Sequence, residues 1–143
     1  MERDGGRKRT EKRKGELQPM PKHVEVVVID DEHSVRSVLT EALAANGYLV
    51  YLADGTNAKE VLTAKQYDLI ITDLRMSVMD GLQTLALAKE KSPEAKLIVI
   101  TGYPSEETLQ LCQELGVARY LVKPFSIREF RQIARNVLRS KNS

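Results

Sequence analysis

Five short apolar runs, separated by segments with helical periodicity, constrain the fold of this 143-residue chain more than any other feature. The runs at 24–29 and 69–72 are rich in β-branched residues, and the run at 69–72 lacks polar alternation, which is typical of a strand covered on both faces. Between the runs, apolar residues recur three and four positions apart, as they do along one face of a helix. The apolar runs are residues 24–29, 49–53, 69–72, 97–100 and 120–122.

This alternation predicts an α/β fold with a single doubly wound, five-stranded parallel sheet and helices on both of its faces. Right-handed crossovers leave few topologies, and the common five-stranded order is 2-1-3-4-5. In that order the carboxyl ends of the first and third strands are neighbours, and ligands bind in the crevice outside them. The chain length fits one domain, which we expect to span residues 24–143.

The residues before the first strand form a basic segment. Residues 1–23 hold eight Lys/Arg and four Asp/Glu, and Leu17 and the methionines are their only large aliphatic side chains. Such a segment cannot bury enough apolar surface to offset the entropy of ordering, so we predict a disordered tail. It is either an arm for nucleic acid or an acidic partner, or a solvated extension; a chain that started at Met20 would reach the first strand almost at once.

Acidic residues follow two strands that the predicted order makes neighbours. Asp30 and Asp31 end the first strand, and Asp73 ends the third. Each acid alone could be a helix cap, but three like charges in one pocket either raise a pKa or bind a cation. Oxygen ligands without His or Cys select a hard ion such as Mg²⁺. The sequence therefore predicts a magnesium site at this edge of the sheet.

Two further polar residues end strands at the same edge. Thr101 closes the fourth strand with a hydroxyl, and Lys123 closes the fifth with a cation. A metal, a lysine and a hydroxyl donor around a carboxylate form a constellation suited to phosphoryl transfer. The carboxylate of Asp73 can then act as a nucleophile and form an acyl phosphate.

Four motifs in this order resemble the receiver domain of two-component response regulators. Each motif lies at a strand end, and the resemblance covers about residues 24–140. It implies the flavodoxin-like receiver fold. The motifs are IDDE at 29–32, TDLRMSVMDG at 72–81, ITGY at 100–103 and YLVKPF at 120–125.

The resemblance implies a role for each acid. Asp73 would be the phosphoacceptor. Asp31 and Asp73 would ligate Mg²⁺ directly, together with the backbone carbonyl of Arg75, and Asp30 would act largely through water. Lys123 would pair with the phosphoryl group.

The resemblance also implies a switch. Thr101 would turn its hydroxyl toward the phosphoryl group, and Tyr120 would move inward with it. The Lys123–Pro124 peptide bond would be cis. One departure is visible, because the family usually has proline where this chain has Ser77, which removes a φ constraint from the loop after the phosphoacceptor.

The expected partners follow from the same resemblance. A sensor histidine kinase or a histidine phosphotransfer protein would donate the phosphoryl group, and a downstream protein would bind the face formed by the fourth helix, fifth strand and fifth helix, about residues 105–143. Dimers formed on phosphorylation are a further possibility, and nucleic acid would be contacted only through an output domain or the basic tail. No apolar run approaches the roughly 20 residues that cross a bilayer, and we expect a cytoplasmic location.

Two alternatives remain at this point. A haloacid-dehalogenase-like aspartate phosphatase would place its nucleophile after the first strand in a D-x-D arrangement, whereas Asp30 and Asp31 are adjacent here and no cap insertion is present. A receiver-like module that binds its partner constitutively would not need all five site groups. The receiver would catalyse its own phosphorylation and dephosphorylation without being a metabolic enzyme, either alone or as a piece of a longer regulator.

Overall fold

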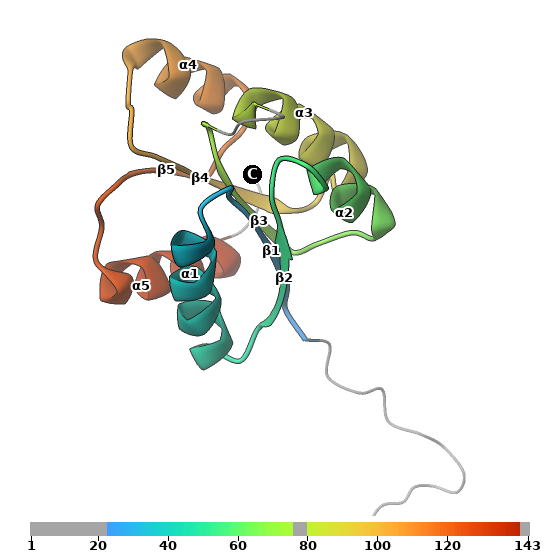
Figure 1. Cartoon of the computed structure of the whole chain (residues 1–143), viewed down its shortest axis with the longest axis vertical. Helices are drawn as coiled ribbons and strands as arrows, with labels where there is room; N and C mark the ends of the chain where they lie inside the picture. Colours follow the sequence, from blue (N-terminus) through green and yellow to red (C-terminus); the bar gives the residue numbers. More distant parts are fainter. Residues whose placement is uncertain (1–22, 76–79, 141–143) are drawn as a thin grey trace, which may run out of the picture.

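The computed structural model describes residues 23–75 and 80–140. Strands and helices alternate strictly along the described chain (Figure 1). The strands are β1 (Glu25–Ile29), β2 (Leu49–Ala53), β3 (Leu69–Asp73), β4 (Lys96–Thr101) and β5 (Arg119–Val122). The helices are α1 (His33–Ala45), α2 (Ala58–Ala64), α3 (Gly81–Lys91), α4 (Glu106–Glu114) and α5 (Ile127–Arg139).

The strands form one parallel sheet in the order β2-β1-β3-β4-β5, which confirms the predicted fold class and strand order. The register places Val28 opposite Ile71 and Ile71 opposite Ile98. β1 and β3 are therefore neighbours although a helix, a strand and a second helix separate them in sequence. Their carboxyl ends meet at the point where the strand order reverses.

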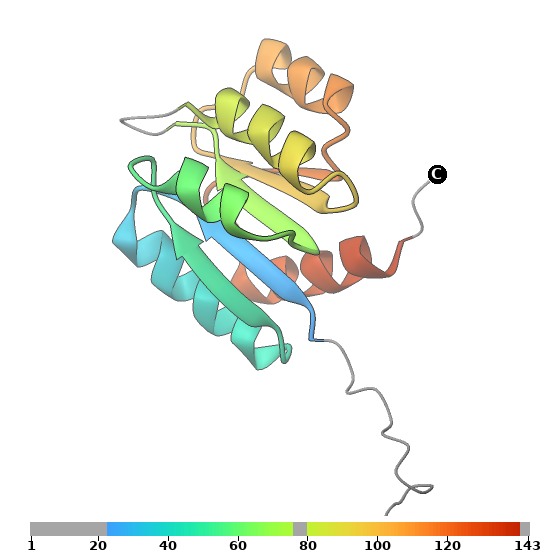
Figure 2. The same ribbon diagram turned by 90° about the vertical axis from the view of Figure 1, so that its right-hand side faces the viewer.

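Helices cover both faces of the sheet, with α1 and α5 on one face and α2, α3 and α4 on the other (Figures 1 and 2). Within β1, alternate residues serve the two layers. Val28 belongs to the core beneath α1 and α5, whereas Val27 and Ile29 belong to the core beneath α2 and α3. All three are fully buried, which explains why the strand shows an unbroken apolar run rather than alternation.

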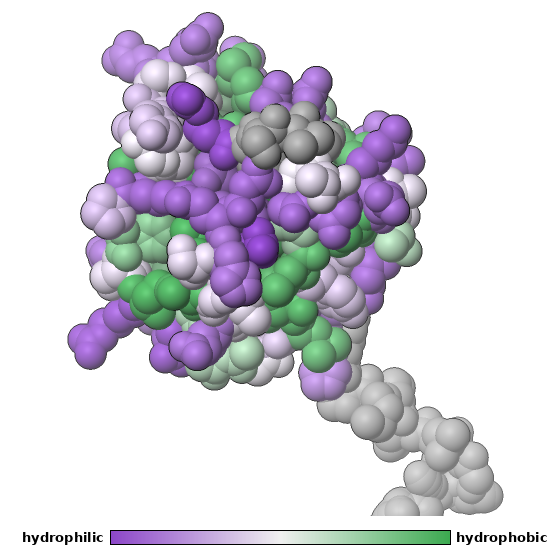
Figure 3. All heavy atoms as spheres, in the orientation of Figure 1, coloured by the Kyte–Doolittle hydropathy of each residue, from purple (hydrophilic) through white to green (hydrophobic). Residues whose placement is uncertain are grey.

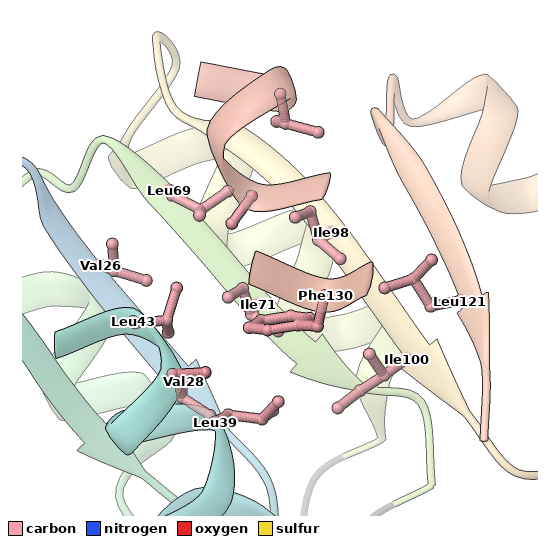
Figure 4. Close-up of a cluster of buried hydrophobic side chains, with 13 residues drawn as sticks. Val26, Val28, Leu39, Leu43, Leu69, Ile71, Ile98, Ile100, Leu121 and Phe130 are labelled. Carbon is pink, nitrogen blue, oxygen red and sulfur yellow. The ribbon is translucent and has the colours of Figure 1, made fainter. Parts of the chain in front are cut away.

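Phe130 of α5 is the largest fully buried side chain of the α1–α5 layer. Figure 4 shows its ring among Ile71 and Ile100 of the sheet and Leu39 of α1. Cutting such a ring back to a methyl group typically costs about 3–5 kcal/mol. This contact fixes α5 against the sheet, and with it the loop that carries Lys123.

Three sequence predictions concern residues outside the described ranges: the disordered tail, the Ser77 loop and the last residues, 141–143. Within the described ranges, no helix is long and apolar enough to cross a membrane.

Candidate functional site

The site is built on the adjacent ends of β1 and β3. Ile29 pairs with Thr72, so Asp30 and Asp73 extend from neighbouring strands at the same edge. Asp30 is fully buried and Asp73 is only 4% exposed. Since a buried carboxylate without a partner is costly, this pair requires a compensating cation.

Lys123 supplies a positive charge to this pair. Its Nζ donates to Asp73 Oδ2 at 2.7 Å and to Glu32 Oε1 at 2.9 Å, and it lies 3.4 Å from Asp30 Oδ2. Lys123 follows β5, and its peptide bond to Pro124 is cis, as expected. The lysine is therefore shared by three carboxylates, two from the β1–α1 loop and one from the end of β3.

Glu32 is a member of the site that the sequence reasoning missed. Ligand oxygens of Asp30, Glu32 and Asp73 all lie within 4.8 Å of one another. Glu32 is the last acid of the IDDE motif, so its adjacency to the two aspartates was the available signal. Its side chain is 63% exposed, so it forms the solvent side of the cluster.

Asp31 points to a different contact. Its Oδ1 accepts a hydrogen bond from the backbone N–H of Gly55 at 2.7 Å, which joins the β1–α1 loop to the β2–α2 turn. Asp31 lies between Asp30 and Glu32 in the sequence. The carboxylate cluster itself, however, consists of Asp30, Glu32 and Asp73. Direct ligation of a metal by Asp31 stays a prediction.

Burial and mutual repulsion change the protonation of the site. Burial raises the pKa of Asp30 from 3.8 to about 6, the charge of Asp73 adds to this increase, and the backbone N–H of Glu32 opposes it. For Lys123, burial alone would lower the pKa. The hydrogen bonds to Asp73 and Glu32 outweigh burial and hold the pKa of Lys123 above its ordinary value, so the lysine is charged.

Thr101 and Tyr120 lie on neighbouring strands but do not contact each other through a hydrogen bond in the described structure. Thr101 is buried, and its Oγ1 accepts from the backbone N–H of Tyr103 at 3.0 Å. The hydroxyl of Tyr120 lies 2.8 Å from Thr108 Oγ1 and accepts from the N–H of Ser105 at 3.4 Å. Tyr120 is thus tied to the first turn of α4, and its motion with Thr101 stays a prediction.

Arg75 lies on the rim of the site. Its backbone N–H donates to Asp73 Oδ1 at 2.9 Å, and its exposed guanidinium lies 4.4 Å from the ring centroid of Tyr103. The hollow above Asp73 is lined by Glu32, Asp73, Arg75, Gly102, Tyr103 and Lys123. Tyr103 was part of the ITGY motif, but nothing in the sequence indicated its contact with arginine.

Gly81 lets α3 begin close to the end of β3. A Cβ at this position would lie 2.4 Å from Leu74 Cα and 2.5 Å from the carbonyl oxygen of Asp73. The N–H of Gly81 instead donates to the Leu74 carbonyl at 3.1 Å. Glycine is needed here for a close approach rather than for a turn.

The donor set fits a hard divalent cation. It consists of carboxylate oxygens of Asp30, Glu32 and Asp73, and it contains no thiolate or imidazole. Hydrophilic side chains gather over the middle of the face shown in Figure 3, where the strands end. The acidic cluster can therefore bind a metal ion and leave one side open to solvent.

A doubly wound parallel sheet with buried carboxylates and a lysine at its switch point defines a phosphoryl-accepting signalling domain. The chain matches the response regulator receiver domain family over residues 26–135, and it belongs to that family.

Curated relatives agree with this assignment. The chain is 29% identical over 119 residues to sporulation initiation phosphotransferase F of Bacillus subtilis, covering 82% of this chain and 96% of that protein. It is 36% identical over 102 residues to transcriptional regulatory protein ZraR of Klebsiella oxytoca, covering 71% of this chain but 23% of that protein. The chain therefore spans nearly all of one relative and about a quarter of the other.

Solved structures show the same fold. A receiver domain protein from Methanospirillum hungatei has a TM-score of 0.78 at 23% identity, covering 82% of this chain and 94% of that one. A response regulator from Burkholderia pseudomallei, solved with a phosphorylated aspartic acid, a calcium ion and citrate, has a TM-score of 0.72 at 27% identity, covering 82% of this chain and 67% of that one.

Family membership and the acidic pocket show that the chain is a phospho-aspartate signalling switch of a two-component phosphorelay and not a classical enzyme. The predicted family and function are confirmed, and the aspartate-phosphatase alternative is not supported. A histidine kinase or phosphotransfer protein is the class of partner that this family implies.

Proposed function

We propose that Asp73 is the residue that accepts the phosphoryl group. The observation that carries this assignment is its position: a nearly buried carboxylate at the end of β3, hydrogen-bonded to a charged lysine and bordering an open polar hollow. A carboxylate oxygen attacks the phosphorus of a donor phosphohistidine, the P–N bond breaks, and the imidazole leaves. Lys123 neutralises charge on the phosphoryl oxygens during the transfer.

The metal would be Mg²⁺. Asp30, Asp31 and Asp73, with the backbone carbonyl of Arg75, would hold it, and Glu32 is a further carboxylate within reach of the same cluster. When bound, Mg²⁺ offsets the negative charge shared by the acceptor and the incoming phosphoryl group. The open side toward the hollow leaves room for that group.

The switch would act through Thr101 and Tyr120. Thr101 ends β4 beside the acceptor strand, since Asp73 pairs with Ile100. Movement of the Thr101 hydroxyl toward a phosphoryl group would remove the acceptor of the Tyr103 N–H bond, and inward movement of Tyr120 would break its contact with Thr108. The first turn of α4 would then be released, which changes the face formed by α4, β5 and α5, about residues 105–143.

The phosphodonor would approach through a groove beside Lys123. This groove runs between α1 and the β5–α5 loop, and its lining is mostly apolar. Val38 and Ile127 are 45% and 37% exposed within it. Because the groove opens next to the lysine that contacts Asp73, a protein that delivers a phosphoryl group can bury apolar surface there while its histidine faces the hollow.

We place this receiver in the cytoplasm with its donor, as one domain over residues 24–143. A stand-alone relay protein similar to the Bacillus subtilis phosphotransferase and a part of a longer regulator similar to ZraR both fit these features. A phosphorylation-dependent dimer is compatible with either.

Phosphorylation by a small donor tests the site without a partner. Incubation with acetyl phosphate and Mg²⁺ is expected to add one phosphoryl group, seen by intact mass and lost on alkaline treatment. Asp73→Asn should abolish this gain, whereas Asp54→Asn, which removes a partly exposed aspartate directly after β2, should not. Unchanged labelling of Asp73→Asn would show that the acceptor is a different residue.

A further inference from the structure

The side chain of Glu32 does not cap the helix that it precedes. Glu32 is the N-cap residue of α1, and its side chain makes no capping hydrogen bond there. Its backbone N–H donates to Asp30 Oδ1 at 2.8 Å, whereas its carboxylate accepts from Lys123 Nζ at 2.9 Å. Capping is the common reason for an acid at the start of a helix. Here the carboxylate is instead bound to the lysine of the site.

The ammonium group of Lys123 has as many carboxylate partners as it has N–H donors. It can donate three hydrogen bonds. Its Nζ lies 2.7 Å from Asp73 Oδ2, 2.9 Å from Glu32 Oε1 and 3.4 Å from Asp30 Oδ2. Lys123 therefore has to release one carboxylate before it can donate to an oxygen of a phosphoryl group on Asp73.

Glu32 is the carboxylate that costs least to release. Its side chain is 63% exposed, whereas those of Asp30 and Asp73 are 1% and 6% exposed. Water can solvate a released Glu32 carboxylate, but a buried aspartate would lose its counter-ion where water does not replace it. The exposures therefore single out Glu32 as the partner that an incoming phosphoryl oxygen replaces on the lysine.

The Glu32–Lys123 ion pair also stands between two hollows. Both residues line the hollow above Asp73, and both line the apolar groove between α1 and the β5–α5 loop. Among the residues that the structure describes, only these two line both hollows. A phosphoryl group that is delivered from the groove to Asp73 therefore passes beside this ion pair.

We propose that Glu32 restrains Lys123 in the unphosphorylated protein and thereby slows phosphoryl transfer and weakens the phosphorylated state. The inference rests on Asp73 being the acceptor. A carboxylate oxygen of Asp73 attacks the phosphorus, and the bond from phosphorus to the leaving group breaks, with its electron pair going to that group. Lys123 exchanges Glu32 for a phosphoryl oxygen in this step. Glu32 is thus a positioning residue that acts through Lys123.

Labelling of the full chain by acetyl phosphate at saturating Mg²⁺ tests this proposal. In that reaction the P–O bond breaks and acetate leaves. Glu32→Ala should be labelled about two- to fivefold faster than the natural chain, because an exposed ion pair no longer has to be broken. Glu32→Gln, which keeps the shape of the side chain but not its charge, should change the rate in the same direction. Structural damage to the site would slow the labelling instead.

Beryllofluoride gives a second readout that involves no reaction. It mimics a phosphoryl group on a carboxylate, so with Mg²⁺ present it should bind Glu32→Ala about two- to fivefold more tightly than the natural chain. Isothermal titration with Mg²⁺ alone should show less than about tenfold weaker binding in the variant, since a nearby charge but no metal ligand is lost.

Glu41→Ala is the matched control, because it removes an exposed glutamate from the same helix, more than two turns beyond Glu32. Glu41 does not line the hollow above Asp73, so its removal should leave the labelling rate and the beryllofluoride affinity unchanged. In a Lys123→Met background, Glu32→Ala should not change the rate, because there is no lysine to release.

Faster labelling on Glu32→Ala in the Lys123→Met background would overturn the proposal, because the effect would then be repulsion of the anionic donor by Glu32. Slower labelling of Glu32→Ala, with Mg²⁺ binding weakened by about tenfold or more, would instead make Glu32 a metal ligand. Labelling that survives Asp73→Asn would contradict the assignment of the acceptor. An unchanged rate in Glu32→Ala, with labelling that still depends on Asp73, would contradict only the role of Glu32.

Discussion

The guanidinium of Arg75 lies 4.4 Å from the ring centroid of Tyr103, at the mouth of the hollow that contains Asp73. Arg75 follows Asp73 by two residues, and Tyr103 follows Thr101 by two. The pair therefore joins the loop after β3 to the loop after β4, directly above the carboxylate. A cation–π contact at such an exposed position is worth about 0.5–1 kcal/mol, enough to bias the position of the arginine without locking it.

Loss of this pair should shorten the lifetime of the phosphorylated state. Both side chains line the hollow that borders Asp73, so phosphoryl oxygens that extend into this hollow would lie beside the guanidinium. Arg75→Ala is expected to speed dephosphorylation severalfold, measured by loss of the phosphorylated species after removal of the donor. Tyr103→Ala should have a similar effect. In the double variant, the change in the activation free energy of dephosphorylation should be smaller than the sum of the changes in the two single variants.

Arg119→Ala is the matched control for this prediction, because Arg119 is exposed on β5 and does not line the hollow. It should leave the lifetime unchanged. An Arg75→Ala variant with an unchanged or longer lifetime would show that the arginine does not protect the acyl phosphate.

Lys123→Met should slow phosphorylation by a small donor by about 10²-fold, since a charge that stabilises the transferring oxygens is lost. Three carboxylates would then repel one another without their shared lysine, so the metal-free variant should also be less stable to urea than the natural chain. Lys96→Met removes a surface lysine that contacts Ser140 and should change neither property. Phosphorylation at the normal rate in Lys123→Met would exclude the lysine from the transfer.

The strand order and the main carboxylates could be predicted because they depend on alternation alone. Asp30 and Asp73 follow apolar runs directly, so any parallel sheet in the order 2-1-3-4-5 brings them together. Glu32 could not be assigned in this way. It lies just before α1 and reaches Lys123 only through the direction of that helix and the path of the β5–α5 loop, which tertiary packing determines.

The same reasoning applies to the side chains around the site. The contact of Tyr103 with Arg75 depends on two loops that no periodic pattern describes. For Tyr120, its place in the strand was predictable, but the partner of its hydroxyl, Thr108, depends on where α4 packs. The positions of groups on strands were thus accessible from the sequence, and the contacts of groups on loops were not.

The raised pKa of Asp30 predicts that the free energy of unfolding depends on pH with opposite signs in the metal-free and the metal-bound protein. With a folded pKa of about 6 against 3.8 in the unfolded chain, the folded state binds more protons between these values. The free energy of unfolding that Asp30 contributes therefore falls as pH rises through about 4 to 6. Metal-free protein should lose stability across this window, measured by urea unfolding, and Asp30→Asn should remove this loss.

Magnesium should reverse that trend, because the ion competes with the proton for the same carboxylates. Stabilisation by Mg²⁺ is expected to be larger at pH 7 than at pH 5, and to grow with the metal concentration. Equal stabilisation at both pH values would show that Asp30 takes no part in the metal site.

The groove between α1 and α5 should distinguish a protein donor from a small one. Val38 is 45% exposed in this groove and lies more than one helical turn after Glu32. The substitution Val38→Glu therefore adds a charge to the groove without touching Asp73. Phosphotransfer from a cognate phosphohistidine protein should weaken about tenfold or more, with the loss in the apparent KM, because burying an unpaired carboxylate opposes docking. Phosphorylation by acetyl phosphate should be unchanged.

Leu52→Glu, which adds the same charge at a position on β2 that is equally exposed, is the control and should preserve both reactions. Equal loss with both donors would place the effect in the site itself rather than in the groove.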